Sequence, residues 1–214
     1  WLGIHESQSR LWENCVGRSR PFWRFFYPIL QQTFPHQLKG IDVEQFYAAI
    51  NRAKPSLIRV EADELTYNLH IMLRFEIERD LIEGRTQPDD LPGIWNDKMK
   101  QYLGIVPDKD ADGVLQDVHW SMGAFGYFPT YTLGNLYAVQ FYEQAKQEIP
   151  HLEDEIAVGQ LMVLRRWLEQ KIHRWGRMYR PEHLAQRITG STISPEPFLR
   201  YLERKYGELY ELSP

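Results

Sequence analysis

Ionisable residues stand at helical spacing near the start of the chain, where His5 is followed by Glu6, Arg10 and Glu13. Side chains separated by one or two helical turns share a face, so a helix would place Arg10 between two carboxylates. Such a row would orient Glu6 in the way that a metal-ligating carboxylate requires. A solvated charge stripe on a surface helix explains the same spacing, and the local pattern by itself favours that interpretation.

A second group consists of Arg59 and Asp63, which fall at the start of a long helix expected over residues 56–82. At this spacing one side chain can orient the other. An arginine whose guanidinium is held by one carboxylate is well suited to bind a second one bidentately, such as the free C-terminus of a peptide. The competing interpretation is an ordinary ion pair within a helix.

A third group lies in the aromatic segment over residues 113–131, which contains Gln116, Asp117, His119, Tyr127 and Tyr131. A histidine and a tyrosine close to one another can donate hydrogen bonds to an oxyanion as it develops, which is a large term in acyl-transfer catalysis. Packing of aromatic rings beneath a turn is the alternative.

The segment from Asp108 to Gly113 matches the opening of a helix-loop-helix calcium loop, D-x-D-x-D-G. The loop should close with a bidentate glutamate, but His119 occupies that position. Because the closing carboxylate dominates the geometry of such a site, the pattern favours a solvated turn. A calcium-responsive helical protein remains a minor alternative.

The elements that would position these groups are all helical, since no convincing alternating strand occurs. The expected helices cover about residues 6–33, 42–51, 56–82, 95–102, 133–148, 152–175 and 195–212. Asp42 and Gln45 have the form of a capping box, and Ser194 before Pro195 reads as another helix start. Nothing marks a domain boundary, so we expect an all-α fold with residues 1–214 forming a single lobe.

Composition limits the class of protein. The chain has 214 residues, one cysteine (Cys15) and a net charge of −4, which argues against nucleic acid as a partner. It shows no secretory signal and no apolar run long enough for a membrane, so a cytoplasmic protein is predicted. The chain starts with Trp1 and a helix is expected almost at once, which suggests a piece of a longer protein.

The three groups together resemble the M32 metallocarboxypeptidases, the carboxypeptidase Taq family. H-E-S-Q at residues 5–8, I-R-V-E-A-D at 58–63 and G-V-L-Q-D-V-H-W at 113–120 match three signature motifs of that family, in the family's order. The resemblance implies that the chain is a helical C-terminal lobe forming one wall of a deep cleft in a larger, gluzincin-like peptidase fold.

Roles follow from the resemblance residue by residue. Glu6 would be the third protein ligand to a catalytic metal, zinc or alternatively cobalt. Arg59 would bind the terminal carboxylate of the substrate, with Gln116 and His119 assisting. By analogy with related peptidases, the residues that stabilise the oxyanion would be His119, Tyr127 and Tyr131.

The resemblance implies a metal-dependent carboxypeptidase that removes single amino acids from peptide C-termini and forms a homodimer. The family's H-E-x-x-H helix, which supplies two histidine ligands and the general base, is not in this sequence. We therefore expect these residues alone to be inactive and to bind no metal tightly. The alternative class is a non-enzymatic helical interaction module that keeps the carboxylate-binding site without the metal.

Overall fold

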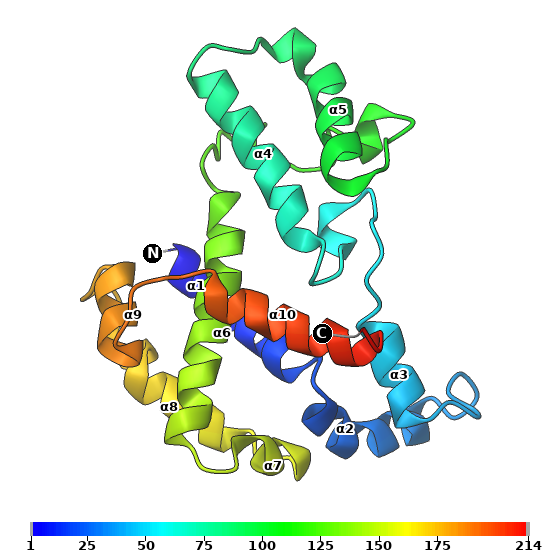
Figure 1. Ribbon diagram of the computed structural model, residues 1–214, viewed down its shortest axis with the longest axis vertical. Coiled ribbons are helices and arrows are strands. Elements are labelled where there is room, and N and C mark those ends of the chain that lie inside the picture. Colours follow the sequence, from blue (N-terminus) through cyan, green and yellow to red (C-terminus); the bar gives the residue numbers. More distant parts are fainter. Residues whose placement is uncertain (1, 213–214) are drawn as a thin grey trace. The chain divides into compact units, whose positions relative to one another are not determined.

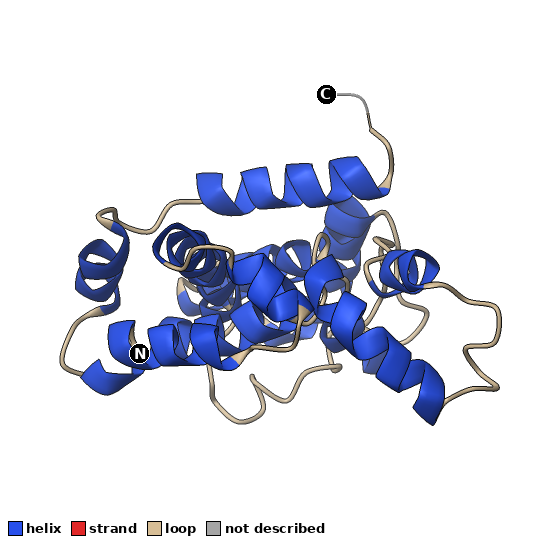
Figure 2. Cartoon of the chain, turned by 90° about the horizontal axis from the view of Figure 1, so that it is seen from below, coloured by secondary structure: helices blue, strands red, loops and turns tan. Residues whose placement is uncertain are grey.

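The structure is a computed structural model that describes residues 2–212. Within that range the regular elements are helices, and no strand is present (Figure 2). The all-α prediction is therefore confirmed. None of the helices in the described range is both long and apolar enough to cross a membrane.

The chain divides into two compact units. Unit 1 consists of Trp1–Asn51 and Leu133–Pro214, and unit 2 consists of Arg52–Thr132. The single lobe expected from the sequence stays a prediction.

The N-terminal part of unit 1 is a series of short helices: α1 (Leu2–Arg10), a π-helix (Leu11–Val16), α2 (Arg20–Thr33) and α3 (Val43–Ile50) (Figure 1). The helical stretch expected over residues 6–33 is divided, because the chain breaks at residues 17–19, just before Pro21. Ser19 has extended backbone and its hydroxyl accepts a hydrogen bond from the backbone of Phe22, so it caps the start of α2.

The capping box before α3 is confirmed. The carboxylate of Asp42 accepts a hydrogen bond from the backbone N–H of Gln45 at 2.7 Å, and the side chain of Gln45 accepts from the backbone of Asp42 at 3.0 Å. The two side chains thus satisfy backbone donors that a helix start leaves unpaired. As expected from the sequence, the helix ends just before Asn51.

The second part of unit 1 follows α6 (Pro129–Glu148), whose first turn belongs to unit 2. It contains α7 (Leu152–Ala157), α8 (Met162–Lys171), α9 (Pro181–Thr189) and α10 (Glu196–Leu209) (Figure 1). The continuous helix expected over residues 152–175 was wrong, because Gly159 adopts a φ of 80° between α7 and α8. The sequence also missed α9.

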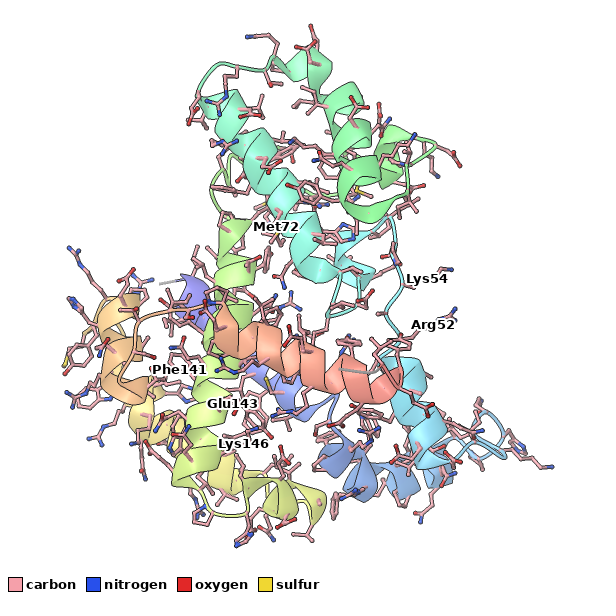
Figure 3. All side chains as sticks on the ribbon, in the orientation of Figure 1. Arg52, Lys54, Met72, Phe141, Glu143 and Lys146 are labelled. Atoms are coloured by element: carbon pink, nitrogen blue, oxygen red, sulfur yellow. The ribbon has the colours of Figure 1, made fainter. Side chains whose placement is uncertain are left out.

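Unit 2 is built around α4 (Tyr67–Ile82) and α5 (Leu91–Leu103), which pack through a core of fully or nearly fully buried side chains. These are Leu73, Ile77, Trp95, Met99 and Leu103. By contrast, the side chain of Met72, labelled on α4 in Figure 3, is 45 % exposed. The opposite face of α4 is therefore the one that holds the unit together.

The long helix predicted over residues 56–82 begins only at Tyr67. One oxygen of Asp63 accepts hydrogen bonds from the backbone N–H groups of Leu65 and Thr66, both at 2.9 Å, and the other accepts from the Thr66 hydroxyl at 2.8 Å. Asp63 therefore forms an Asx turn that competes with the helix. Upstream of it, Arg59–Glu61 form a single 3-10 turn.

Candidate functional site

Glu6 lies on α1, and its side chain is partly exposed. The hydroxyl of Ser9 donates to a Glu6 carboxylate oxygen at 3.4 Å. Further along the same helical stretch, Arg10 pairs with Glu13 at 3.0 Å, so this half of the expected row of charges is present. The π-helix that starts at Leu11 changes the register within this row.

The position of Glu6 is set by close packing of α1 against α6 within unit 1. Gly134 of α6 lies so near α1 that a Cβ atom added to it would stand 2.5 Å from the Cβ of Glu6. Ser7 is fully buried, and its hydroxyl donates a hydrogen bond to the backbone oxygen of Ile4 at 2.6 Å. The hydroxyl is therefore paired within α1. Glycine at 134 therefore allows the backbone of Glu6 to approach α6.

Glu6 is chemically suited to be a metal ligand, but the described residues hold no group of three or more His, Cys, Asp or Glu side chains that could bind a metal ion. A catalytic zinc site takes three protein ligands and leaves one position open. The assignment of Glu6 as a metal ligand stays a prediction. The segment from Asp108 to Gly113 lies within the described residues and forms no such group. In this segment Nζ of Lys109 lies 3.4 Å from a carboxylate oxygen of Asp112.

A cavity of about 420 Å³ lies beside α1 in unit 1 and is lined in part by His5 and Gln8, on either side of Glu6. The ring nitrogen Nε2 of His173 lies 2.8 Å from the side-chain oxygen of Gln8, which ties the start of α1 to the segment after α8. No local pattern predicts this contact, since the two residues are 165 positions apart.

Arg59 is held by a carboxylate, as expected, but not by Asp63. Its Nε and Nη2 atoms lie 3.1 and 2.6 Å from the same oxygen of Asp117, and Nη1 donates to the Tyr67 hydroxyl at 2.7 Å. The prediction of the partner was wrong because Asp63 is occupied by its own turn and Arg59 precedes the helix. The guanidinium carbon also lies 4.9 Å from the ring centroid of Tyr131.

A second arginine, Arg74 of α4, binds the other oxygen of Asp117. Its Nε and Nη2 atoms lie 2.8 and 2.7 Å from that oxygen, and Nη1 donates to the backbone oxygen of His70 at 2.8 Å. Arg74 is fully buried and Arg59 is 4 % exposed. We call Arg59, Asp117 and Arg74 the arginine cluster. It holds two cations and one anion, so it carries an excess positive charge.

The electrostatics of the arginine cluster follow from burial and mutual pairing. Burial lowers the pKa of Arg74 to about 10, against the attraction of Asp117, so the side chain is still charged at neutral pH. For Arg59 burial acts to lower the pKa, but the bond to Asp117 outweighs it and the pKa is raised. Burial acts to raise the pKa of Asp117, yet the two arginines bring it below its ordinary value.

His70 lies beside the cluster and adds no charge to it. The residue is fully buried, and among the described residues neither of its ring nitrogens has a hydrogen-bond partner. Burial and the nearby positive charges of Arg74 and Arg59 lower the pKa of His70 to about 4. Its imidazole is therefore neutral at physiological pH.

Gln116 acts on the backbone of unit 2. Its side-chain oxygen accepts a hydrogen bond from the backbone N–H of Arg59 at 2.9 Å, and its amide nitrogen lies 3.0 Å from the backbone oxygens of both Leu57 and Asp112. These contacts tie the segment that carries Arg59 to the loop that carries Asp117. They account for the arrangement of two motifs that are far apart in the sequence.

The structure brings His119, Tyr127 and Tyr131 together. Nε2 of His119 lies 3.2 Å from the Tyr131 hydroxyl, and Nδ1 lies 3.8 Å from the Asp117 carboxylate. The Tyr127 ring lies 5.3 Å from the His119 ring and 5.4 Å from the Tyr131 ring, measured between centroids. The side chain of His119 also packs on Phe128, with 4.3 Å between ring centroids.

Burial lowers the pKa of His119, and the charges of Arg59 and Arg74 act in the same direction, while Asp117 opposes them. The neutral imidazole is thus the favoured form at neutral pH. A neutral imidazole has one N–H donor and one acceptor nitrogen. In the bond between them, either His119 or Tyr131 can therefore be the donor, depending on the tautomer of His119.

Glu78 holds the loop that carries His119. It is buried on α4, and its two oxygens accept hydrogen bonds from the indole N–H of Trp120 at 2.9 Å and from the backbone of Gly126 at 3.2 Å. The sequence missed Glu78, as it missed Tyr67 and Arg74, because none of the three lies in the quoted motifs. The only local signal is that the three positions share one face of the helix expected over residues 56–82.

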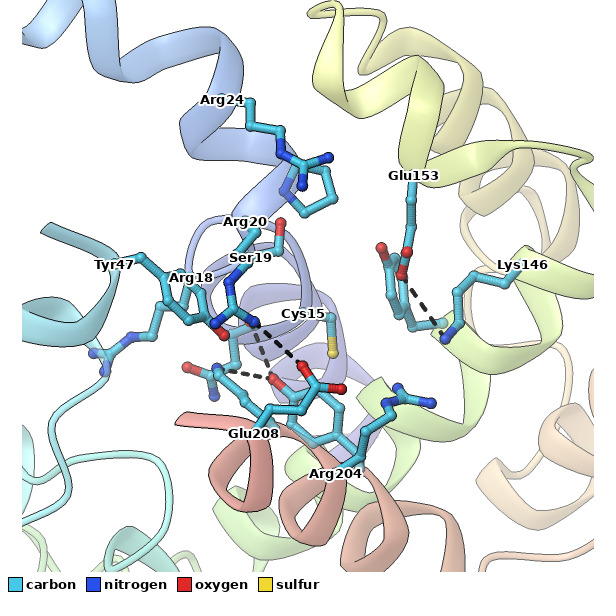
Figure 4. A pocket seen from close by; sticks show the side chains of 15 residues that line it. Cys15, Arg18, Ser19, Arg20, Arg24, Tyr47, Lys146, Glu153, Arg204 and Glu208 are labelled. Carbon is cyan, nitrogen blue, oxygen red and sulfur yellow. Dashed lines mark hydrogen bonds and ion pairs between the residues drawn. The ribbon is translucent and has the colours of Figure 1, made fainter. Parts of the chain in front are cut away.

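Several basic side chains of unit 1 line a cavity of about 480 Å³ (Figure 4). Some of them lie near carboxylates: Arg20 is 3.2 Å from Glu208, and Lys146 is 2.9 Å from Glu143. Figure 3 labels Lys146 and Glu143 on α6. The positive charge of this cavity is thus partly offset by carboxylates.

Comparison with known proteins points to one family. The family model of the carboxypeptidase Taq (M32) metallopeptidases matches residues 1–206. Thermostable carboxypeptidase 1 of Thermus thermophilus is 51% identical over 209 residues, which cover 98% of this chain and 41% of that protein. Carboxypeptidase 1 of Bacillus subtilis is 44% identical over 211 residues, covering 99% of this chain and 42% of that protein.

The fold of the chain is also similar to that of a solved carboxypeptidase of this family. The crystal structure of the M32 carboxypeptidase from Deinococcus radiodurans R1 superimposes with a TM-score of 0.95 at 46% identity, and covers 99% of this chain and 43% of that one. The chain thus spans about two fifths of the length of the curated relatives that it matches. On the family model and these relatives together, the chain belongs to the carboxypeptidase Taq (M32) metallopeptidase family.

Proposed function

We propose that the protein containing this chain is a metal-dependent carboxypeptidase that removes single amino acids from the C-termini of peptides. The observation that carries the proposal is the arginine cluster, a buried group with excess positive charge beside the His119–Tyr131 pair. An anion with a free carboxylate is the ligand that such a charge distribution favours. A peptide with a free C-terminus supplies that carboxylate next to its last peptide bond.

In this proposal Arg59 binds the terminal carboxylate. Its guanidinium has more N–H donors than Asp117 and Tyr67 use, so donors are left for a second carboxylate. Asp117 and Tyr67 fix the plane of the guanidinium, which reduces the entropy lost on binding. Gln116 serves the same end through its bonds to the backbone of Arg59 and Leu57, rather than through contact with the substrate.

His119 and the two tyrosines are proposed to stabilise the oxyanion. If the neutral His119 donates its Nε2 proton to the Tyr131 hydroxyl, the phenolic proton of Tyr131 is directed to another acceptor, such as the carbonyl oxygen under attack. Tyr127 packs against both rings and is the second candidate for this role. The lowered pKa of His119 keeps the imidazole in the required neutral form.

Glu6 is proposed as one protein ligand of the metal, zinc or cobalt, whose remaining ligands lie outside the described residues. A metal at such a site polarises the scissile carbonyl and activates a water molecule. We also propose a cytoplasmic homodimer that acts on peptides, and an inactive chain when residues 1–214 stand alone. Activity or stoichiometric metal in that chain alone would contradict the assignment of Glu6 as a single contributed ligand.

The experiment compares Arg59→Ala with the parent protein in its full-length form, on a blocked dipeptide with a free carboxylate and on the amide of that dipeptide. We expect KM for the free acid to rise at least about tenfold, because a bidentate charged contact is lost. Arg79→Ala is the matched control, since Arg79 is an exposed arginine of the same unit. An unchanged KM in Arg59→Ala would remove Arg59 from substrate binding.

A further inference from the structure

Arg74 is connected to Arg59 through one shared carboxylate. Asp117 uses one oxygen for Arg59 and the other for Arg74, so the rotation of its carboxylate is fixed from both sides. Arg74 itself cannot move easily. It is fully buried, its Nη1 is bound to the backbone of His70, and its guanidinium carbon lies 4.5 Å from the ring centroid of Trp95.

A purely structural role explains the charges of this cluster poorly. A single buried arginine would neutralise Asp117, and a second one adds repulsion and the cost of removing another cation from water. Two other titratable side chains of α4 face the cluster: His70, which is neutral, and Tyr67, whose hydroxyl accepts a hydrogen bond from Arg59. The charge of Asp63 acts on His70, but the oxygens of Asp63 accept hydrogen bonds from Leu65 and Thr66 in its own turn. The remaining polar neighbours on the loop and on α6, His119 and Tyr131, supply no negative charge at neutral pH.

The excess charge is balanced once a carboxylate binds. Two guanidinium groups and two carboxylates form a neutral set, in which Asp117 lies between the arginines and the ligand takes the free donors of Arg59. We propose that Arg74 is a positioning residue for substrate binding: it fixes Asp117, and through it Arg59, and supplies the second positive charge that a terminal carboxylate neutralises. This inference rests on the proposed role of Arg59.

The test is a double-mutant cycle in the full-length protein, with Arg74→Met, Arg59→Ala and the pair combined. The readout is KM and kcat for the blocked dipeptide with a free carboxylate. Arg74→Met is expected to raise KM about tenfold while kcat changes much less. In the Arg59→Ala background, Arg74→Met should raise KM by much less than in the parent, because the positioning effect passes through Arg59 and only the attraction between the Arg74 charge and the ligand is left.

Two further variants separate positioning from stability. Arg74→Lys keeps the charge but cannot bind Asp117 with a planar fork, so its KM should lie between those of the parent and Arg74→Met. It also provides the measurement if Arg74→Met does not fold. Leu73→Ala removes an equally buried side chain of the same helix without touching Asp117, and it should lower the stability while leaving KM unchanged.

The possible failures are distinguishable. If Arg59→Ala raises KM and neither Arg74 variant does, the inference is wrong and the proposed role of Arg59 stands. An equal effect of Arg74→Met in both backgrounds also overturns the inference, since Arg74 would then act independently of Arg59. If Arg59→Ala itself leaves KM unchanged, the proposed function of Arg59 fails and the inference fails with it.

Discussion

Glu6 in unit 1 and Arg59 in unit 2 are held in place by different physical means. Glu6 owes its position to shape, because glycine at 134 lets the backbone of α1 approach α6. Arg59 owes its position to charge and hydrogen bonds, because Asp117 and Tyr67 both bind its guanidinium. The first arrangement tolerates no added volume, whereas the second tolerates no change of charge.

The two regions also differ in how complete they are. The arginine cluster lies wholly within unit 2, where Arg59 and Arg74 both pair with Asp117. Glu6 is one side chain of a kind that a catalytic zinc takes in threes, and the described residues hold no group of three or more such side chains that could bind a metal ion. Changes in unit 2 should therefore act on stability and substrate binding directly, while changes at Glu6 should act on metal binding in the longer protein.

The largest effect is expected from Asp117→Asn, which leaves two buried guanidinium groups without a counter-charge. Breaking a buried ion pair in this way costs about 3–5 kcal/mol. Urea unfolding of the full-length protein measures the loss. Asp97→Asn, at an exposed carboxylate of α5 in the same unit, is the control and should change the stability by less than about 0.5 kcal/mol. A loss below about 1 kcal/mol for Asp117→Asn would show that charge does not hold unit 2 together.

The next effect is a dependence of stability on pH that His70 imposes on unit 2. Its pKa is about 4 in the folded protein and about 6.5 in an unfolded chain, so only the unfolded state takes up a proton between these values. Above about pH 6.5 the titration of His70 should not change the free energy of unfolding. As the pH is lowered from there to about 4, the free energy of unfolding should fall by about 3 kcal/mol.

His70→Leu removes this titration, and its stability should fall less than that of the parent over the same pH range. His36→Leu, at an exposed position, should keep the parent's slope. Denaturant unfolding at a series of pH values gives both slopes. Identical slopes for the parent and His70→Leu would mean that His70 takes up its proton as easily in the folded state.

A smaller effect is expected in unit 1 from Gly134→Ala, whose new methyl group would overlap Glu6. Overpacking of this kind costs about 1–3 kcal/mol, and a displaced Glu6 should also weaken metal binding. Gly207→Ala is the matched control, because a Cβ atom at that position of α10 meets nothing within 4 Å. Chelator competition measures metal affinity in the full-length protein, and an unchanged affinity would separate Gly134 from the position of Glu6.

The smallest effect is expected from Glu13→Gln, which removes an ion pair with Arg10 near the same helix. The side chain of Glu13 is 45 % exposed, so water and salt screen the interaction. The loss should be below about 0.5 kcal/mol and should vanish at high salt. A loss above about 1 kcal/mol would mean that charge contributes to the position of α1 as it does in unit 2.

The sequence predicted what depends on neighbours along the chain. The capping box at Asp42 and the helical character of every element are local properties, and both are confirmed. The motifs also identified Arg59 and His119 as residues that belong together. Their assigned roles stay predictions, but the structure brings both residues to the same carboxylate, Asp117.

The sequence could not predict what depends on contacts across the fold. The helical spacing of Arg59 and Asp63 predicts that they are partners, but the Asx turn at Asp63 delays that helix to Tyr67. Arg74 lies 43 residues from Asp117, and no spacing rule connects them. The contact between Arg74 and Asp117 forms only because α4 and the loop after α5 pack together.

The π-helix after α1 has a consequence for how the family could vary in length. At the end of the π-helix, the backbone N–H of Gly17 donates a hydrogen bond to the backbone oxygen of Trp12, five positions earlier. The turn therefore carries one residue more than an α-helical turn. Loss of one residue there would restore ordinary α-helix and leave Glu6 facing Gly134. The same deletion between Gly3 and Glu6 would rotate the preceding residues by about 100° relative to Glu6. Natural insertions and deletions should therefore be confined to the π-helix and absent from α1.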